Sequence, residues 1–595
     1  MNFDAIEHRA FDNYCYPINK DELEINIRTG SDITKLFLVW GDPFAGGILG
    51  GNWEWKGTRT EITEVKELQK FLWWTIVVKP EFKRCRYYFE LHAGDGVFYC
   101  CEDGFYTEAE FKALPFNLSC FTFPWMNPAD ICTPPTWPAA TVWYQIFPSR
   151  FSRGTGGCRE ALAERLFKAW AGPEQAVTND EEYGGNLQGI TDRLDYLTDL
   201  GITGIYLNPV NLSRTQHKYD TTDYLEIDPS FGTKQDMKRL VSEAHKRHIR
   251  IMLDGVFNHS GWDFFAWQDV LKNREKSKYA GWYMINDFDF PAKPGDNSRK
   301  GKYFAFAFAD SMPKLNTNNP EVREYLLKVC ETWVKEYDID ALRLDVANEV
   351  SHLFCQELQK RMRSLKSDFY IIGEIWHNSL PWLRGNEFDA VMNYPLQNTI
   401  SNFTLTGTMT TKQFEQNINR CLTMYFRQTE EVLFNQMDSH DTIRLVTKSG
   451  SREKALQQLV FLFAMPGSAC IYYGTEVLLE GGHDPDCRRC MPWKEIEEGK
   501  YDGELSFMKT LIALRRTQSA LRGFNVQFVY DGKEAEETPR VVHIRKTSDD
   551  GTETIDVLFN FGNVPCEADC TDRIVLLGNA YKDGVVRPAG FVMWK

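Results

Sequence analysis

Short apolar runs that stop at polar side chains are the feature of this sequence that most restricts its fold. Each run has the length of a strand and is apolar on both faces, which is typical of a buried parallel strand. Four of the runs lead directly into acidic or basic residues. These are 249–253 with Asp254, Asn258 and His259; 341–344 with Arg343 and Asp345; 369–373 with Glu374; and 432–434 with His440 and Asp441.

Eight strand candidates alternate with amphipathic helical patterns in the middle of the chain. They are residues 142–147, 202–207, 249–253, 341–344, 369–373, 388–392, 432–434 and 469–473. This is the number of strands that a closed (β/α)₈ barrel needs, and the C-terminal ends of those strands converge on one mouth. We therefore predict an α/β fold in which the polar strand ends meet in one site at the mouth of a barrel.

Asp345 and Glu374 have the properties of a carboxylate pair that cleaves glycosides. On a strand, Arg343 and Asp345 point to the same face, and a carboxylate beside a permanent cation stays ionised. An ionised carboxylate can attack a sugar, whereas its partner must carry a proton, which the apolar run before Glu374 favours. We predict Asp345 as the nucleophile and Glu374 as the general acid and base. A purely structural Arg343–Asp345 ion pair is the alternative.

The same stretches resemble the four signature regions of the α-amylase family of glycoside hydrolases (family 13). The stretches are 254–259 (Asp-Gly-Val-Phe-Asn-His), 342–349 (Leu-Arg-Leu-Asp-Val-Ala-Asn-Glu), 373–376 (Gly-Glu-Ile-Trp) and 438–441 (Asp-Ser-His-Asp). Within that family the chain resembles the neopullulanase, cyclomaltodextrinase and maltogenic amylase group. The additional matches are 217–223 (His-Lys-Tyr-Asp-Thr-Thr-Asp), 312–316 (Met-Pro-Lys-Leu-Asn) and 484–489 (Asp-Pro-Asp-Cys-Arg-Arg).

The resemblance implies further roles in binding the substrate. Asp441 would be a third catalytic acid that grips the hydroxyls of a distorted sugar, and Tyr219 would stack under that sugar. His259 and His440 would donate hydrogen bonds to it. Arg343 would orient Asp345, Asp254 would support the site, Asp484 and Arg488 would anchor a neighbouring glucose, and Asn348, Glu349, Trp376 and His377 are candidate contacts on the acceptor side or plain loop residues.

The pattern of strands and turns predicts four parts in the chain. Residues 1–125 read as a β-sandwich, 126–140 as a Pro-rich linker, 141–522 as the barrel with an inserted subdomain at 260–315, and 523–595 as a second β-sandwich. Trp53 and Trp55 could stack on sugars, although packing in the core is the simpler interpretation. In the resembling group the first domain is carbohydrate-binding-like and helps form a dimer, so the resemblance implies a homodimer.

The composition favours a neutral ligand. The net charge is −15, which argues against nucleic acid or an anionic membrane as a partner. We find no signal peptide and no membrane-spanning run, and the 15 cysteines are scattered, so we expect a cytoplasmic protein. Cys487 and Cys490 have the spacing of a redox or metal motif, but no second pair lies near them, so we predict no metal there.

Two departures from the family bear on calcium. Ser149 and Asn186 stand where relatives often have acidic residues, and calcium prefers several oxygen ligands, many of them charged. We therefore predict no cofactor and no calcium at that loop. A third departure, Gly255 in place of a usual alanine, is expected to matter little.

The predicted activity is hydrolysis of α-1,4 bonds in cyclodextrins, maltooligosaccharides, pullulan or starch, with some transglycosylation. One alternative is a non-catalytic protein that binds α-glucans on the same fold. Another is an α-1,6-glucosidase-type reaction of the same family. The sequence does not rank these glucans as substrates, because the ranking depends on the width of the cleft.

Overall fold

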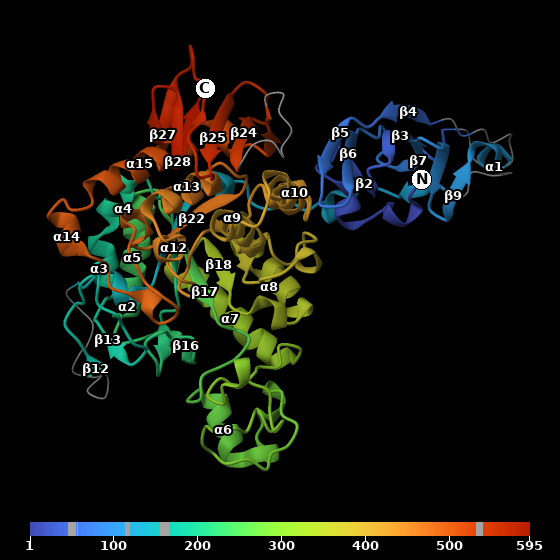
Figure 1. Ribbon diagram of the computed structural model, residues 1–595. Coiled ribbons are helices and arrows are strands. Elements are labelled where there is room, and N and C mark those ends of the chain that lie inside the picture. Colours follow the sequence, from blue (N-terminus) through green and yellow to red (C-terminus); the bar gives the residue numbers. More distant parts are fainter. Residues whose placement is uncertain (46–54, 56, 114–118, 155–165, 531–539) are drawn as a thin grey trace. The chain divides into compact units, whose positions relative to one another are not determined.

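The computed structural model describes residues 1–45, 55, 57–113, 119–154, 166–530 and 540–595. The chain forms two compact units (Figure 1). The first unit comprises Met1–Thr133 with Asn378–Gly385 and Met409–Glu430. The second comprises Pro134–His377, Asn386–Thr408 and Glu431–Lys595, and it contains the barrel.

A barrel of eight parallel strands is the centre of the second unit. In chain order the strands are β11 (Val142–Ile146), β14 (Gly204–Leu207), β17 (Arg250–Gly255), β18 (Ala341–Leu344), β19 (Tyr370–Gly373), β20 (Ala390–Val391), β21 (Phe434–Gln436) and β22 (Ser468–Tyr472). Each pairs with its neighbours in the order β20-β19-β18-β17-β14-β11-β22-β21, and a parallel bridge between Met392 and Phe434 closes the circle. The predicted (β/α)₈ barrel is confirmed, and all eight strands were anticipated.

The register of the central strands decides which polar residues meet. Asp254 pairs with Arg343 across β17 and β18, and Leu344 pairs with Gly373 across β18 and β19. Asp345 and Glu374 are therefore the next residues beyond paired positions at the same end of the sheet. Gly373 is required here, because a Cβ atom on it would lie 2.7 Å from the Phe388 ring.

Some of the helices that cover the barrel begin at residues whose side chains cap the first backbone N–H groups. α5 (Lys234–Lys246) begins at a capping box of Thr233 and Asp236, and α8 (His352–Leu365) begins at Ser351, whose side chain accepts a backbone N–H. The other long helices are α7 (Pro320–Tyr337), α9 (Tyr394–Thr406), α13 (Arg452–Phe463) and α15 (Asp502–Thr517). Such caps fix the residue at which each of these helices begins.

An insertion follows β17, as predicted, and projects from the barrel around α6 (Phe265–Asn273; green in Figure 1). Its small core is aromatic: the buried Trp267 ring lies 4.7 Å from Tyr283, 4.9 Å from Tyr303 and 6.0 Å from Phe290. Isolated bridges such as Ala305 to Pro313 replace regular strands here. Buried aromatic area therefore stabilises this insertion more than backbone ladders do.

The N-terminal unit contains two antiparallel sheets. One has the order β1 (Cys15–Pro17), β2 (Leu23–Thr29), β6 (Leu72–Val78), β5 (Glu64–Glu67); the other has β4 (Thr58–Glu61), β3 (Ile33–Gly41), β7 (Cys85–Ala93), β8 (Gly96–Cys101), β9 (Gly104–Thr107), with β10 (Phe121–Phe123) on β7. Trp55 is buried and donates its indole N–H to the Asp42 carbonyl oxygen, so the prediction that it packs in the core is confirmed. Trp53 lies outside the described residues.

The last strands form an antiparallel sheet in the second unit. They are β23 (Asn525–Phe528), β24 (Val541–Thr547), β25 (Thr554–Asn560), β26 (Cys566–Glu567), β27 (Val575–Lys582) and β28 (Val585–Trp594), and β28 pairs with β25, β26 and β27. Val542, Ile544, Val557 and Phe559 are fully buried on it. The predicted fold class, a barrel with β domains before and after it, is confirmed.

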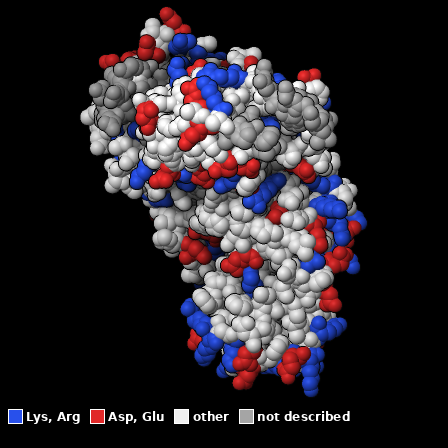
Figure 2. Space-filling view, turned by 90° about the vertical axis from the view of Figure 1, so that its right-hand side faces the viewer, with Lys and Arg blue, Asp and Glu red and all other residues white. Residues whose placement is uncertain are grey.

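The surface carries charges of both signs. On the face in Figure 2, basic and acidic side chains are interspersed, and the residues that the structure describes form no continuous basic patch there. Within the described ranges, no helix combines the length and the apolar character that crossing a membrane requires.

We predict that Arg515→Met destabilises the barrel. The buried Arg515 guanidinium donates to the carbonyl oxygens of Phe463 and Met465, at 2.6 Å each, and of Leu521 at 2.8 Å. Methionine would leave these buried carbonyls without donors, at about 1–3 kcal/mol for each unsatisfied group. We expect chemical denaturation to give a free energy of unfolding lower by about 3 kcal/mol or more.

The neighbouring Arg516→Met is the control for this prediction. Arg516 is exposed and makes one long contact, 3.4 Å from its Nη1 to the Gly201 carbonyl oxygen. Its loss should change the free energy of unfolding by no more than about 0.5 kcal/mol. Equal effects of the two substitutions would contradict the structural role of Arg515.

Candidate active site

One buried guanidinium holds three carboxylates at the mouth of the barrel. Arg343, on β18, donates from Nη1 to both oxygens of Asp254, at 2.8 and 3.0 Å, and to Oδ1 of Asp345 at 2.9 Å. Its Nη2 forms an ion pair with Oε2 of Glu374 at 2.8 Å. All four side chains are buried. The residues predicted from three separate strand ends are therefore brought together around a single cation.

The carboxylates outnumber the cation, and this sets their protonation. Burial raises the pKa of Asp345 well above its ordinary value; Arg343 opposes the shift, but Glu374, Asp254 and Asp441 add to it. Burial likewise raises the pKa of Asp254 and that of Asp441. The expectation from sequence that Arg343 alone keeps Asp345 ionised is therefore incomplete, because one guanidinium is shared among several acids. Such a cluster binds protons as a unit.

Glu374 is held by two further donors. Its Oε2 accepts the backbone N–H of Val346 at 3.0 Å, and its Oε1 accepts the indole N–H of Trp376 at 3.1 Å. The Trp376 ring is itself fixed, because it stacks on Tyr394 with ring centres 3.7 Å apart. Val346 has φ 45° and ψ 44°, a left-handed conformation that a β-branched residue rarely adopts. This strain points the Val346 N–H at Glu374, and strain of this kind is often found at functional sites.

Tyr219 and His440 line the floor of the site. The Tyr219 hydroxyl donates to Oδ2 of Asp254 at 2.9 Å and lies 2.7 Å from Nε2 of His440. Gln145 donates to Nδ1 of His440, so the proton of the neutral ring is on Nε2. Burial lowers the pKa of His440 well below its usual value and that of His259 to about 3. Both rings are therefore neutral at physiological pH, and Nε2 of His259 donates to the carbonyl oxygen of Tyr219 at 3.0 Å.

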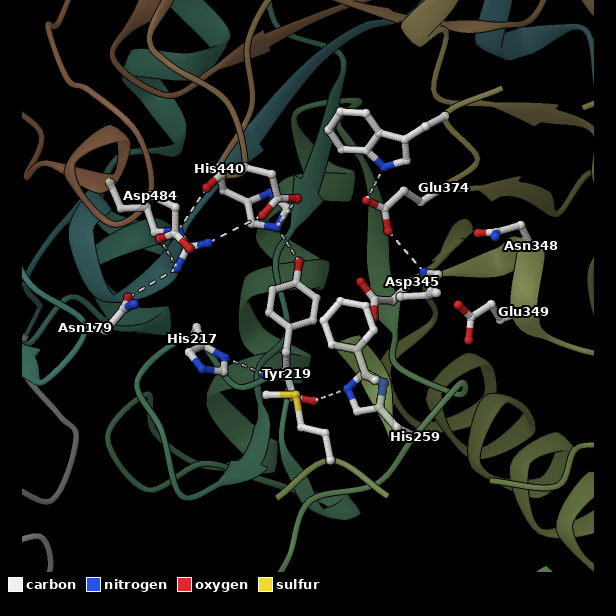
Figure 3. A pocket seen from close by; sticks show the side chains of 16 residues that line it. Asn179, His217, Tyr219, His259, Asp345, Asn348, Glu349, Glu374, His440 and Asp484 are labelled. Atoms are coloured by element: carbon white, nitrogen blue, oxygen red, sulfur yellow. Dashed lines mark hydrogen bonds and ion pairs between the residues drawn. The ribbon is translucent and has the colours of Figure 1, made fainter. Parts of the chain in front are cut away.

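Asp441 and Arg488 form the opposite side of the site. Oδ1 of Asp441 lies 3.4 Å from Nη2 of Arg488, and Oδ2 lies 3.1 Å from Nε2 of His440. The Nη1 of Arg488 pairs with Asp484 at 2.8 Å and approaches the amide oxygen of Asn179 at 3.4 Å. Figure 3 shows His440, Asp484 and Asn179 on one side of the view, and Asp345, Glu374 and Glu349 on the other.

These groups surround a cavity of about 480 Å³. Most of the predicted site residues line it: Tyr219, His259, Asp345, Asn348, Glu349, Glu374, Trp376, His440, Asp441, Asp484 and Arg488. Asp254 and Arg343 are buried behind Asp345 and support it through the ion pairs above. His377 is exposed and does not line the cavity.

Five lining residues were not predicted as site residues. They are Asn179, His217, Phe306, Met312 and Val346. His217, Met312 and Val346 lie inside stretches that carry the family resemblance. Their closeness in sequence to predicted site residues could therefore have indicated that they line the cavity. Phe306 stacks on His259, with ring centres 5.2 Å apart, and belongs to the irregular insertion. No sequence signal indicates Asn179.

The structure also bears on metal binding. Among the described residues, no group of three or more His, Cys, Asp or Glu side chains is placed to hold a metal ion. At the loop considered for calcium, Oδ1 of Asn186 already accepts the N–H of Gly189 and of Gly154, and Ser149 donates to Gln216. These oxygens serve the protein, so the described part of the loop does not fit calcium. Cys487 instead donates its thiol to the carbonyl oxygen of His440.

The carboxyl groups lie at the mouth of a (β/α)₈ barrel, beside a cavity lined with polar side chains. This arrangement defines a class of protein, a glycoside hydrolase that uses carboxyl groups as catalysts. Comparison with known proteins specifies the class further. Residues 145–511 match the description "Alpha amylase, catalytic domain", and residues 1–127 match "Alpha amylase, N-terminal ig-like domain".

Relatives of similar length match along nearly the whole chain. A cyclomaltodextrinase of Geobacillus thermopakistaniensis is 42% identical over 570 residues, covering 95% of this chain and 92% of its own. Neopullulanase 2 of Thermoactinomyces vulgaris is 38% identical over 539 residues, covering 90% and 88%. A solved cyclomaltodextrinase structure superposes with a TM-score of 0.87 at 36% identity, covering 100% of both chains. The chain belongs to the α-amylase family.

We predict that Asp345→Asn abolishes turnover and stabilises the fold. A carboxyl whose pKa is raised on folding binds more protons in the native state, so its stabilising effect is lost as pH rises through the folded-state pKa. At neutral pH the ionised Asp345 therefore lowers stability, and the neutral amide would not. We expect turnover to fall by about 10⁴-fold or more, and the melting temperature at pH 7 to rise.

Asp340→Asn, at the other end of β18, is the matched control. Burial tends to raise the pKa of Asp340, but hydrogen bonds from His245 and from the Ile251 N–H outweigh it and hold this pKa below its usual value. The stabilising contribution of such a group is present above its unfolded-state pKa and lost as pH falls. Asp340→Asn should therefore lower the melting temperature at pH 7. If Asp345→Asn lowered it as well, the electrostatic account of the cluster would be wrong.

Proposed function

We propose that this protein is a retaining hydrolase of α-1,4-glucosidic bonds in small or cyclic α-glucans, with some transglycosylation. The observation that carries the proposal is the buried Arg343, which holds Asp345 and Glu374 side by side at the rim of the cavity. Retaining enzymes need two carboxyl groups that are close together, one as nucleophile and one as acid. The names of the relatives, cyclomaltodextrinase and neopullulanase, favour cyclodextrins and pullulan as substrates.

In this mechanism, Asp345 attacks the anomeric carbon while Glu374 gives its proton to the leaving oxygen. The cluster suits this division of roles, because Arg343 contacts both carboxyl groups and can compensate the charge of either one. Asp345 accepts a hydrogen bond from Nη1 of Arg343 at 2.9 Å, which favours its ionised form. In the second step Glu374 takes a proton from water, and the water releases the sugar from Asp345 with its original configuration.

The remaining residues would bind the sugar that is cleaved. The Tyr219 ring would stack under it, and His259 and His440 would hydrogen-bond to its hydroxyls in place of their present contacts with Tyr219. Asp441 would accept from two hydroxyls. Arg488 keeps Asp441 in place at 3.4 Å and, with Asp484, would anchor the next glucose on the non-reducing side.

Asn348, Glu349 and Trp376 would form the acceptor side. They line the cavity next to the two carboxylates, and the Trp376 ring is half exposed and so available for stacking. Stacking on an aromatic ring is a common way to bind the apolar face of a sugar. His377 is exposed next to them and would contact only a longer acceptor.

We also propose that the protein is a homodimer without a metal cofactor and that it acts in the cytoplasm. Two relatives from Bacillus subtilis are named intracellular maltogenic amylase, and each is 40% identical over 525 residues. Fourteen described cysteines carry no disulfide, which suits a reducing compartment. Sedimentation of the purified protein at two concentrations would test the dimer.

Product analysis tests the proposed activity. We expect rapid opening of β-cyclodextrin, cleavage of pullulan to panose, slow digestion of soluble starch, and products that appear first as the α-anomer by NMR. A β-anomer would exclude the retaining mechanism. Release of maltotriose from pullulan would instead support the α-1,6 alternative, and binding without any product would support a non-catalytic glucan-binding protein.

We predict that Glu374→Gln separates acid catalysis from nucleophilic attack. Glutamine keeps the shape of Glu374 and one of its two acceptor oxygens but carries no transferable proton. Turnover of maltotriose should fall by about 10²–10⁴-fold. Release of fluoride from α-maltosyl fluoride should fall much less, because this leaving group needs no proton. Asp345→Asn is the comparison, and it should lose both reactions. Near wild-type turnover of maltotriose by Glu374→Gln would exclude it as the acid.

A further inference from the structure

The ammonium group of Lys314 lies in a cage of oxygen atoms beside the cavity. Its Nζ donates to the amide oxygen Oδ1 of Asn258, to the backbone carbonyl oxygen of Glu349 at 3.1 Å, and to the carboxylate Oε2 of Glu349 at 3.1 Å. The Lys314 side chain is only 19% exposed. No step of the mechanism above uses this lysine.

The three oxygens join parts of the chain that are distant in sequence. Asn258 follows β17, Glu349 ends the short helix η9 (Ala347–Glu349) after β18, and Lys314 belongs to the insertion. The backbone of Lys314 is fixed in turn: its N–H donates to the carbonyl of Phe304 at 3.0 Å, and its own carbonyl accepts the N–H of Met284 at 3.2 Å. The ammonium group therefore connects the insertion rigidly to two strand ends of the barrel.

Both connected segments line the cavity. The insertion supplies Phe306 and Met312 to the lining, and η9 supplies Asn348 and Glu349. η9 also begins directly after Val346, whose strained backbone N–H binds Glu374. A displacement of η9 would thus move the group that orients Glu374, and a shift of about 1 Å at a catalytic group can reduce the rate by about 100-fold.

The oxygens around Lys314 are of the kinds that bind a hard divalent cation. A side-chain amide oxygen, a backbone carbonyl and a carboxylate are typical calcium ligands. We propose that Lys314 is a positioning residue whose ammonium group serves as an internal cation: it holds the loop after the nucleophile against the insertion, at a place where the same oxygens would otherwise need a metal ion. The changes in kcat expected below rest on the proposed function, whereas the change in melting temperature with calcium does not.

Lys314→Met removes the charge and keeps most of the side-chain length. We expect kcat on β-cyclodextrin to fall at least about tenfold, because η9 is no longer held, while KM changes less than about threefold. Lys302→Met is the matched control: Lys302 is in the same insertion and pairs only with Asp287 among the described carboxylates. Its kcat should equal that of the wild type. A kcat of Lys314→Met within twofold of the wild type would overturn the proposal.

Lys314→Asp tests the cation directly, since it adds a carboxylate to the existing oxygens and removes the ammonium group. Without metal its kcat should be as low as that of Lys314→Met. Calcium chloride at 5 mM, roughly the range in which weak protein sites fill, should raise its melting temperature and restore at least part of kcat. The melting temperatures of the wild type and of Lys314→Met should not respond.

A Lys314→Asp variant whose melting temperature does not respond to calcium would overturn the role as an internal cation. If the Lys314→Asp variant fails to fold, Lys314→Arg provides a second test because it keeps the positive charge. It should retain more activity than Lys314→Met. Equal activity of these two variants would also contradict the proposal. Failure of the wild type on every glucan would overturn the proposed function instead, and the calcium-dependent melting of Lys314→Asp would still test the cage.

Discussion

The site depends on one interaction, the contact of the buried Arg343 guanidinium with three carboxylates. A buried carboxylate without a partner costs several kcal/mol, and three together would repel one another. Arg343 makes the arrangement possible because its planar group offers several donors in fixed directions and stays charged even when buried. The parallel register of β17, β18 and β19 then places the acids around it, one from each strand end.

Because one cation serves several acids, the protons belong to the cluster rather than to one residue. This is useful for a reaction in which one carboxyl must be charged while its neighbour first gives a proton and then takes one back. The neutral histidines fit the same logic. Burial lowers the pKa values of His259 and His440, so the two rings line the site without adding cations that would compete with Arg343.

The walls of the cavity show a second use of buried charge. Arg343 fixes the catalytic acids, and Lys314 fixes the loop after Asp345 by binding three oxygens from two segments. Both are side chains that bring together parts of the chain more than fifty residues apart. Rigid placement of this kind is what lets loops carry catalytic groups, since a loop by itself has few contacts that hold its shape.

Most of the fold and most of the lining residues could be predicted from the sequence, because strand ends in a barrel must meet at one mouth and because Asp345, Glu374 and Asp441 each follow an apolar run. What the sequence determined by itself was local: which segments are strands, where helices begin, and which side chains stand at strand ends. Only the tertiary structure decided that Arg343 is shared among three acids, that Phe306 and Asn179 reach the cavity, that His377 does not line it, and that Lys314 is caged by oxygens. These features depend on burial and on contacts between segments far apart in the chain, and such contacts leave no periodic or compositional trace in the sequence.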